Sequence, residues 1–449
     1  MRVSEATGKS ASEIQERCRC SKTALKRFLE GELEIDTLKG AREPSAIKDQ
    51  LKRHIDFKGL IIVMLGLEDK DALKLDGEYP SNFVFHLIPK SKVRNERPHQ
   101  ILRHYLKAKA EFRMRIKWSS QYSAYTLLKA GEDLEDWITN PRFDVYMPSM
   151  EMALKLEELC KVRPTLIVKK LGGLHSLYQG ARLIADIAFA ERGSDIKVER
   201  KNSREDIDIA SIEEHAELNR AVIEKLEEAS LSYLSSFDVD YAVVPWSGGK
   251  DSTAALILSL KVFKDKVIPT FIDTGLEFKE TLEYVNQLAS RLGITPLKLK
   301  APIREIIEAG KPLPTNKNRW CTQLKVKAAK DFIKQLSKKG RVLMVVGDRE
   351  AESPSRLRRP ATITHEDHIE AAPIKQWSAL HVQLYLALNK VPVNAMYDYG
   401  FFRIGCYICP ALRNWEIKLI MEKEELKYIK ENALFEIFAK ERGMLIKQP

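Results

Sequence analysis

The stretch VVPWSGGKDSTAAL, residues 243–256, joins an apolar segment to helix-forming sequence through glycines, a lysine and two serines. Val243 and Val244 are typical of the end of a buried strand, and the residues from Thr253 onward favour a helix. Glycines at such a junction let a ligand approach the backbone, and the N–H groups at the helix start favour an anion. A tight turn before a capped helix is the alternative. The complete SGGKDS hexapeptide between strand and helix instead predicts a phosphate-binding loop.

This hexapeptide differs from the commoner phosphate-binding loop, in which a glycine and four further residues precede Gly-Lys-Ser or Gly-Lys-Thr. It resembles the PP-loop of the ATP pyrophosphatases, the adenine nucleotide α-hydrolase group. The resemblance implies binding of ATP with Mg²⁺ and activation of a substrate by adenylylation. Lys250, a mobile cation suited to phosphate, and Asp251 are the predicted catalytic residues of the loop. The residues assigned to the phosphates are Ser247, Gly248, Gly249, Lys250, Asp251 and Ser252.

The composition limits the class of protein. A chain of 449 residues, 44% hydrophobic and 31% charged, is expected to fold into two or three globular domains. The longest apolar run, Leu60–Leu65, is too short to cross a membrane, and the first residues do not resemble a secretory signal. The sequence therefore predicts a cytoplasmic protein without membrane contact. Its net charge of +11 suits polyanionic partners but also occurs in proteins that have none.

Residues 1–70 are predicted to be helical. The segment SEIQERCRCSKTALKRFLEGE, residues 12–32, has the spacing of a helix-turn-helix in which Ser21 caps the second helix. That helix would present its basic residues to a DNA groove. The small residue and the turn glycine usual in such units are missing. A helical hairpin that only packs is therefore the alternative.

Residues 71–205 are predicted to form a basic α+β region. Its segment 86–117 carries ten cations against two acids, and Tyr105, Phe112 and Trp118 are interleaved with them. Such cations can follow a phosphate backbone while aromatic rings stack on bases, which predicts contact with tRNA or DNA. The alternative is a solvated basic helix whose aromatic rings face the core. The ten cations are Lys90, Lys92, Arg94, Arg97, Arg103, Lys107, Lys109, Arg113, Arg115 and Lys117.

Residues 210–449 alternate between strand and helix patterns, after a polar linker expected at 199–208. This alternation predicts an α/β domain in which a parallel sheet has helices on both faces. A ligand of such a sheet lies at the carboxyl ends of its strands, which is where the SGGKDS loop is placed. The predicted strands are 241–244, 267–273, 295–300 and 341–347.

Further segments follow the loop: DTGLEF (273–278), RWCTQLK (319–325), GDREAES (347–353), APIKQWSALHVQLYL (372–386) and YDYGFFRIGCYICP (397–410). Their order resembles the phosphoadenylyl-sulfate reductase family of PP-loop proteins across residues 213–412. The resemblance implies that the strand carrying Asp273, with Gly275 after it, lines the nucleotide site. It also implies a catalytic Arg349 that closes on the far end of the nucleotide or on the leaving group. A structural ion pair of Arg349 with a neighbouring glutamate is the alternative.

The sequence departs from this family in its cysteines. The reductases carry a nucleophilic cysteine in a tail motif, whereas no cysteine follows Pro410 here. The iron–sulfur members place a cysteine pair early and C-x-x-C later. Here the early site holds only Cys321, and Cys406 and Cys409 form the later motif. Three cysteines would hold a [4Fe–4S] cluster with one open iron, similar to PP-loop enzymes that thiolate tRNA and to DNA phosphorothioation proteins. Zinc, or three unliganded cysteines, are the alternatives.

These features favour an ATP-dependent sulfurtransferase that adenylylates a nucleic acid, releases pyrophosphate and delivers sulfur from an iron–sulfur cluster. The sequence predicts neither the sulfur donor nor the oligomeric state. An assimilatory reductase of adenylyl-sulfate or phosphoadenylyl-sulfate is the first alternative, although it does not explain the missing tail cysteine or the basic front half. A DNA-binding protein that responds to a nucleotide, with residues 12–32 reading DNA, is the second.

Overall fold

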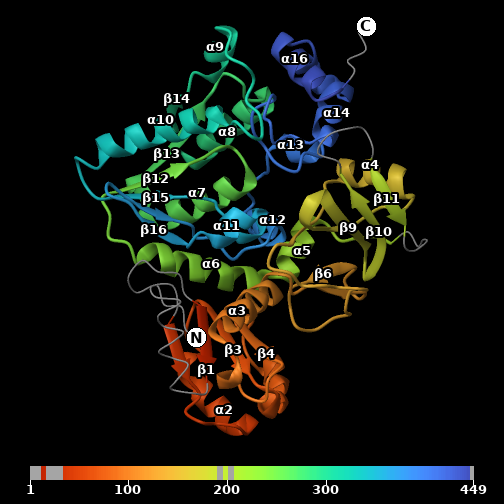
Figure 1. The fold of residues 1–449 in the computed structure, drawn as a ribbon, viewed down its shortest axis with the longest axis vertical. Coiled ribbons are helices and arrows are strands. Elements are labelled where there is room, and N and C mark those ends of the chain that lie inside the picture. Colours follow the sequence, from red (N-terminus) through yellow and green to blue (C-terminus); the bar gives the residue numbers. More distant parts are fainter. Residues whose placement is uncertain (1–11, 17–33, 190–195, 201–206, 445–449) are drawn as a thin grey trace.

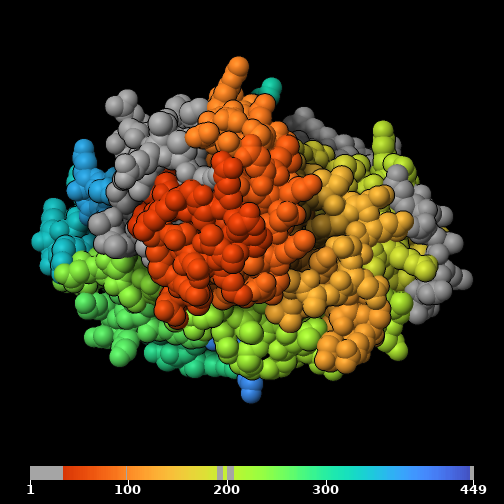
Figure 2. All heavy atoms as spheres, turned by 90° about the horizontal axis from the view of Figure 1, so that it is seen from below, coloured from red at the N-terminus to blue at the C-terminus, as the bar shows by residue number. Residues whose placement is uncertain are grey.

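The computed structural model describes residues 12–16, 34–189, 196–200 and 207–444. Three sheet-containing regions follow one another along the chain (Figure 1). An N-terminal module ends with α3 (Pro98–Arg113), a middle region ends with β11 (Lys197–Arg200), and a C-terminal domain follows. Seen from below, the N-terminal module and the middle region lie side by side against the C-terminal domain (Figure 2). Among the described helices, none combines the length and the apolar character needed to cross a membrane.

The N-terminal module is a parallel sheet of order β2-β1-β3-β4 with a helix on each face. The apolar strand β3 is buried on both faces, as is typical of parallel sheets. Ile61 packs with α2 on one face, whereas Ile62 packs with α3 on the other. The elements are β1 (Ser12–Glu16), β2 (Glu34–Thr37), α2 (Pro44–Leu51), β3 (Leu60–Leu65) and β4 (Phe83–Leu87).

The prediction that residues 1–70 are helical is wrong for β1, β2 and β3, whereas α2 is a helix. Residues 12–16, where the predicted helix-turn-helix begins, form β1, which pairs in parallel with β2 and β3. Pairing on both sides of a strand outweighs helical spacing, which is only a weak local preference. The predicted second helix, residues 21–32, lies outside the described residues.

The middle region is an antiparallel sheet of order β11-β10-β9-β8-β7. Its edge strand β7 contacts α12 (Ala379–Leu388) of the C-terminal domain. The predicted linker at 199–208 begins inside β11, because that strand ends at Arg200. The other elements are β5 (Lys117–Ser119), β6 (Ala124–Thr126), β7 (Asp144–Tyr146), α4 (Met150–Cys160), β8 (Leu166–Lys169), β9 (Leu174–Gln179) and β10 (Arg182–Ala188).

The C-terminal domain confirms the predicted α/β fold. Its sheet has the order β14-β13-β12-β15-β17-β16, and the first five strands are parallel. Only β16 runs antiparallel, against β17. From β12 the chain adds β13 and β14 on one side and then β15 on the other. The strand order therefore reverses between β12 and β15, and this position is the switch point where ligands bind in such sheets. The strands are β12 (Tyr241–Pro245), β13 (Val267–Asp273), β14 (Leu297–Lys300), β15 (Val342–Val345), β16 (Thr362–Thr364) and β17 (Ile369–Ala371).

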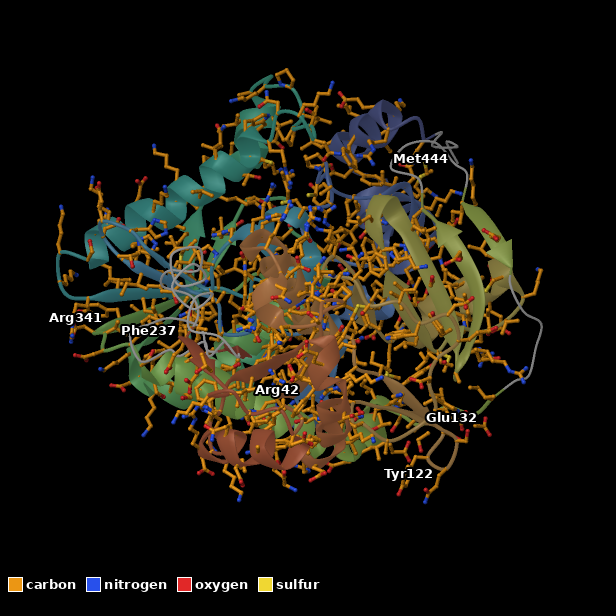
Figure 3. The ribbon with its side chains drawn as sticks, turned by 60° about the horizontal axis from the view of Figure 1, so that its bottom comes forward. Arg42, Tyr122, Glu132, Phe237, Arg341 and Met444 are labelled. Atoms are coloured by element: carbon orange, nitrogen blue, oxygen red, sulfur yellow. The ribbon has the colours of Figure 1, made fainter. Side chains whose placement is uncertain are left out.

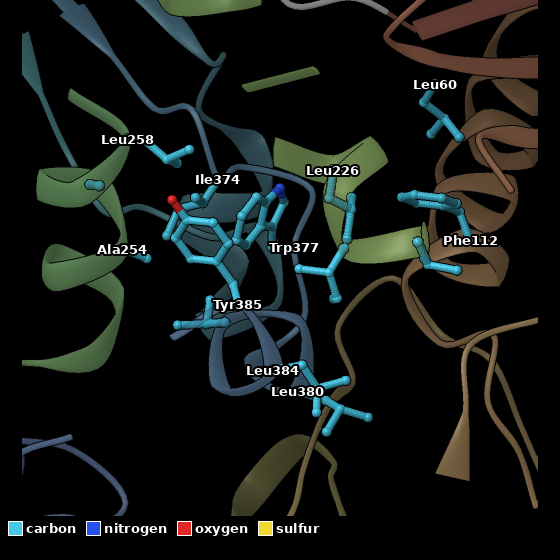
Figure 4. Close-up of a cluster of buried hydrophobic side chains, with 14 of the residues drawn as sticks. Leu60, Phe112, Leu226, Ala254, Leu258, Ile374, Trp377, Leu380, Leu384 and Tyr385 are labelled. Atoms are coloured by element: carbon cyan, nitrogen blue, oxygen red, sulfur yellow. The ribbon is translucent and has the colours of Figure 1, made fainter. Parts of the chain in front are cut away.

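Helices cover both faces of this sheet, as predicted. Alternate residues of β12 point to opposite faces. Val244 belongs to the large core that α6, α7, α8 and α12 also fill, part of which Figure 4 shows around Trp377 and Tyr385. Val243 packs instead with Ile333 of α10. The helices are α6 (Arg220–Ser235), α7 (Lys250–Phe263), α8 (Lys279–Leu292) and α10 (Trp320–Leu336).

The last helices of the chain join the C-terminal domain to the middle region. A second core contains Met152 of α4 together with Phe401 and Leu419. The remaining α-helices are α5 (Ile212–Leu218), α9 (Ile303–Glu308), α11 (Pro354–Arg358), α13 (Ala395–Asp398), α14 (Asn414–Glu422), α15 (Lys427–Lys430) and α16 (Ala433–Glu441).

The basic segment 86–117 does not offer aromatic rings to a partner. Tyr105, Phe112 and Trp118 are buried in the core, so stacking of these rings on bases is excluded in this fold. Lys109 and Arg113 are buried as well. The rings therefore face the core, as the alternative expected, while contact of the segment's cations with nucleic acid stays a prediction. The cations of the segment that remain exposed are Lys90, Arg94, Arg97, Arg103 and Lys107.

Candidate nucleotide-binding site

The predicted PP-loop connects β12 to α7 at the switch point of the sheet. Gly248 has a φ of +74°, and a Cβ atom there would lie 3.1 Å from side chains of α8, so the turn requires glycine. The Ser252 hydroxyl donates to the Gly249 carbonyl at 2.9 Å and lies 3.2 Å from the Ser247 hydroxyl. This tight turn leads into a helix of 14 residues. A helix start of this kind, preceded by glycines, is suited to binding phosphate.

A chain of alternating charges begins at this loop. Lys250 Nζ donates to Asp251 Oδ2 at 2.9 Å, and Arg349 Nε donates to Asp251 Oδ1 at 2.6 Å. The Nη1 atom of Arg349 donates to Asp144 Oδ2 at 2.8 Å. Asp144 belongs to β7, so the middle region contributes a charge to the site. The structure therefore brings together the three predicted catalytic residues, Lys250, Asp251 and Arg349.

A second buried group of charges connects the site to the N-terminal module. Glu350, which follows Arg349, accepts hydrogen bonds from Lys109 and from Arg113, both on α3. All three side chains are buried. The expected alternative, an ion pair of Arg349 with a neighbouring glutamate, is thus not formed: Arg349 pairs with Asp144 and Asp251, while Glu350 pairs with α3.

Burial and charge act against each other at this site. Burial alone would raise the pKa of Asp251, but the cations of Arg349 and Lys250 outweigh it and hold that pKa well below its usual range. Burial, together with the nearby cations of Arg349 and Lys250, lowers the pKa of Lys169, on β8, to about 8 against the opposing effect of Asp144. A bound anion would relieve the repulsion among Lys169, Lys250 and Arg349. The electrostatics therefore favour a phosphate at the loop.

The end of β13 is arranged by its own hydrogen bonds. Asp273 Oδ1 accepts from the N–H of Gly275 at 3.0 Å, and Gly275 has a φ of +71°. Glu277 accepts from the N–H of Thr274 at 3.1 Å and from its hydroxyl. Glu277 also forms an isolated β-bridge with Cys406, so the C-x-x-C turn lies beside the carboxyl end of β13. Both Asp273 and Gly275 thus lie at the predicted edge of the sheet.

The three predicted metal ligands pack in one apolar core without forming a metal site. Cys406 is buried, Cys321 and Cys409 are half-buried, and none is in a disulfide. Cys406 Sγ lies 3.1 Å from Lys325 Nζ and 3.4 Å from the Thr274 hydroxyl. Within the described ranges, no group of three or more His, Cys, Asp or Glu side chains could hold a metal ion. As folded, the cysteines therefore do not form a group that fits the predicted [4Fe–4S] cluster or zinc, and Cys406 instead contacts an ammonium.

Sequence reasoning missed three residues of the site: Asp144, Lys169 and Tyr397. The Tyr397 hydroxyl accepts from the N–H of Lys250 at 3.2 Å, and its ring centroid lies 5.3 Å from Lys250 Nζ. Tyr397 opens the segment YDYGFFRIGCYICP, so that segment was a signal for it. Asp144 and Lys169 lie on strands far earlier in the chain, and no local pattern marks them.

A PP-loop at the switch point of a parallel sheet defines an α/β domain of the PP-loop class. More specifically, residues 241–412 match the family model of the phosphoadenosine phosphosulfate reductase domain.

The relatives of this domain have diverged. The chain is 35% identical to an uncharacterized protein of Methanocaldococcus jannaschii over 52% of this chain and 58% of that protein, so it spans little more than half of that relative. It is 28% identical to the adenosine 5'-phosphosulfate reductase of a Chelativorans species over 41% of this chain and 69% of that protein. The phosphoadenylyl-sulfate reductase of Candida auris, solved as a phosphate complex, is 22% identical with a TM-score of 0.34 and covers 45% of this chain and 98% of its own.

Proposed function

We propose that the protein binds ATP at the PP-loop, transfers the adenylyl group to an oxygen of a nucleic acid with release of pyrophosphate, and so activates that oxygen for replacement by sulfur. The observation that carries the proposal is the buried network of Lys250, Asp251 and Arg349 at the start of α7. It sets two cations at a glycine-rich helix start, where phosphates bind. The sulfur chemistry named in the family of residues 241–412 supports the second half.

The first step is a displacement at the α-phosphorus of ATP. An acceptor oxygen attacks this phosphorus, its bond to the oxygen that bridges to the β-phosphate breaks, and pyrophosphate leaves with the electron pair. Lys250 and Arg349 are the cations that would stabilise the charge developing on the leaving group. Mg²⁺ takes most of its ligands from water and phosphate and needs only one or two carboxylates. Asp251 is the loop carboxylate that would hold it.

The second step exchanges oxygen for sulfur at the activated acceptor. A hydrosulfide donor attacks the carbon bearing the adenylylated oxygen, the carbon–oxygen bond breaks, AMP leaves, and a carbon–sulfur bond remains. No iron–sulfur cluster takes part in this proposal, because Cys321, Cys406 and Cys409 do not fit one as folded.

Removing the loop cation tests the nucleotide site. Lys250→Ala is expected to weaken binding of ATP with Mg²⁺ at least tenfold, about 1.4 kcal/mol, because the loop loses its charge toward phosphate. Titration calorimetry on the full chain measures this. Lys298→Ala is the matched control, since Lys298 is exposed on β14, and should bind as the wild type does. A Lys250→Ala protein with an unchanged melting temperature and unchanged ATP affinity would refute the site.

Product analysis then distinguishes ATP-dependent adenylylation of a nucleic acid from reduction of a sulfonucleotide. Pyrophosphate release from ATP that increases when tRNA or DNA is added supports the proposal. Consumption of adenylyl-sulfate in the presence of a thiol, without any ATP, would instead give the protein the reaction named for its reductase relatives.

A further inference from the structure

A basic surface lies on the C-terminal domain, away from the segment 86–117. Residues 311–339 contain nine Lys or Arg residues and a single acid, Asp331. Eight of these nine cations are exposed, and no ion pair joins any of the eight to an acidic side chain of the described ranges. We call six of the eight the α10 basic surface: Lys317, Arg319, Lys327, Lys330, Lys334 and Lys338.

Helix geometry aligns the last four of these lysines. They are spaced three or four residues apart, so they share one side of α10 and of the turn that follows it. At a rise of about 1.5 Å per residue, this side is about 16 Å long. The opposite side carries Ile333 and Leu336, which pack on the sheet. The helix is thus anchored by its apolar side, and side chains of the opposite side project away from the sheet (Figure 3).

The charges of this surface favour binding of a sugar–phosphate backbone. Like charges three and four residues apart repel each other on a helix, and a polyanion would remove that repulsion. Within α10, Val326 is the one large apolar side chain that is exposed, at 45%. A helix bound to a membrane buries an apolar face, which α10 lacks outside its contact with the sheet. No aromatic ring is exposed on α10 for stacking, so contact with the backbone and not with bases is expected.

The surface leads to the nucleotide-binding edge of the sheet. Lys325, near the start of α10, contacts Cys406, which in turn pairs with Glu277 just beyond the end of β13. The start of α10 therefore lies at the edge where the carboxyl ends of the strands and the PP-loop lie. A nucleic-acid strand bound along α10 would therefore run toward the edge of the sheet that carries the PP-loop.

We propose that the α10 basic surface binds the sugar–phosphate backbone of the nucleic acid on which the domain acts. The identity of that nucleic acid as the substrate rests on the proposed function, whereas the binding itself does not. The contact then lies on the domain that carries the PP-loop, not on the segment 86–117.

The salt dependence of binding tests this surface in the full chain. The variant Lys327→Gln, Lys330→Gln, Lys334→Gln, Lys338→Gln keeps good helix formers while removing the charges. Binding of a fluorescein-labelled RNA hairpin and a labelled DNA duplex is measured by anisotropy at several salt concentrations. The slope of log K against log salt is expected to become shallower by about 3, since each phosphate contact contributes about 0.7–0.9. The matched control, with the same change in net charge, is Lys90→Gln, Arg94→Gln, Arg103→Gln, Lys107→Gln; it should keep the wild-type slope.

Several outcomes would contradict the proposal that the α10 basic surface binds nucleic acid. One is an equal reduction of the salt slope in both variants, and another is a reduction in the control variant alone. The third is the absence of salt-dependent binding of either probe by the wild type. Binding to phosphatidylserine vesicles that depends on the same four lysines, with neither probe bound, would make the surface a membrane contact instead. ATP affinity is measured on the same samples. A wild-type protein that binds RNA or DNA through these lysines but binds no ATP refutes the proposed function and still supports the α10 basic surface as a nucleic-acid contact.

Discussion

Replacing Asp144 with alanine is expected to lower the free energy of unfolding by about 3–5 kcal/mol, because it leaves the buried guanidinium of Arg349 with one of its two carboxylates missing. The side chains of Arg349 and Asp144 are 3% and 4% exposed, so water cannot replace the lost partner. Asp144 Oδ1 also accepts from the N–H of Ala379 at 2.9 Å, at the start of α12. Urea unfolding followed by circular dichroism measures the change.

An exposed ion pair provides the control for this prediction. Asp133 pairs with Lys117, but its side chain is 88% exposed, so Asp133→Ala should change the free energy of unfolding by about 1 kcal/mol or less. Equal effects of Asp133→Ala and Asp144→Ala would contradict a structural role for the buried pair.

The same carboxylate gives stability a defined dependence on pH. Burial would raise the pKa of Asp144, but Arg349 and Lys169 outweigh burial and hold that pKa below its usual range. A depressed pKa stabilises the fold above the unfolded pKa of about 4 and loses that contribution as pH falls through the folded pKa. Asp144→Asn cannot ionise. The stability gap between it and the wild type is therefore expected to narrow as pH falls below about 4.

Local and periodic features of this protein can be predicted from its sequence. The end of β12, the glycine turn and the start of α7 are neighbours in the chain, so the stretch 243–256 predicts all three. The alternation of strands and helices after residue 210 predicts the parallel sheet for the same reason, because each pattern is read within one element. The resemblance carried by segments such as GDREAES implies that Arg349 closes on the nucleotide, and the structure places its guanidinium against Asp251 of the loop.

Features that depend on contacts between distant segments could not be predicted. Lys109 and Arg113 have the spacing of a solvated basic helix, and only the fold shows that both pair with Glu350. Ser12–Glu16 has helical spacing, yet its pairing with β2 and β3 makes it a strand. The cysteine spacing indicates a metal site, yet Lys325 places an ammonium against one of the thiols. In each case the residue or strand that determines the contact lies in a distant part of the sequence, which a local sequence pattern does not show.

Gly347, which follows β15, is expected to be required for the nucleotide site. A Cβ atom at this position would lie 2.6 Å from the carbonyl carbon of Asp251 and 2.8 Å from the backbone nitrogen of Ser252. These are backbone atoms in the first turn of α7, so they cannot yield as the end of a flexible side chain can. Gly347→Ala must therefore push the loop that carries Arg349 away from the PP-loop.

We expect Gly347→Ala to weaken ATP binding at least tenfold, about 1.4 kcal/mol, and to destabilise the fold by about 1–3 kcal/mol. Calorimetric titration and urea unfolding measure the two effects. Gly77→Ala is the matched control, because a Cβ at Gly77 would meet nothing within 4 Å, and it should change neither quantity beyond about 0.5 kcal/mol. Wild-type ATP affinity in Gly347→Ala would mean that the approach of β15 to α7 does not position Arg349 for the nucleotide. The buried link from Asp251 through Arg349 to Asp144 would then serve stability alone.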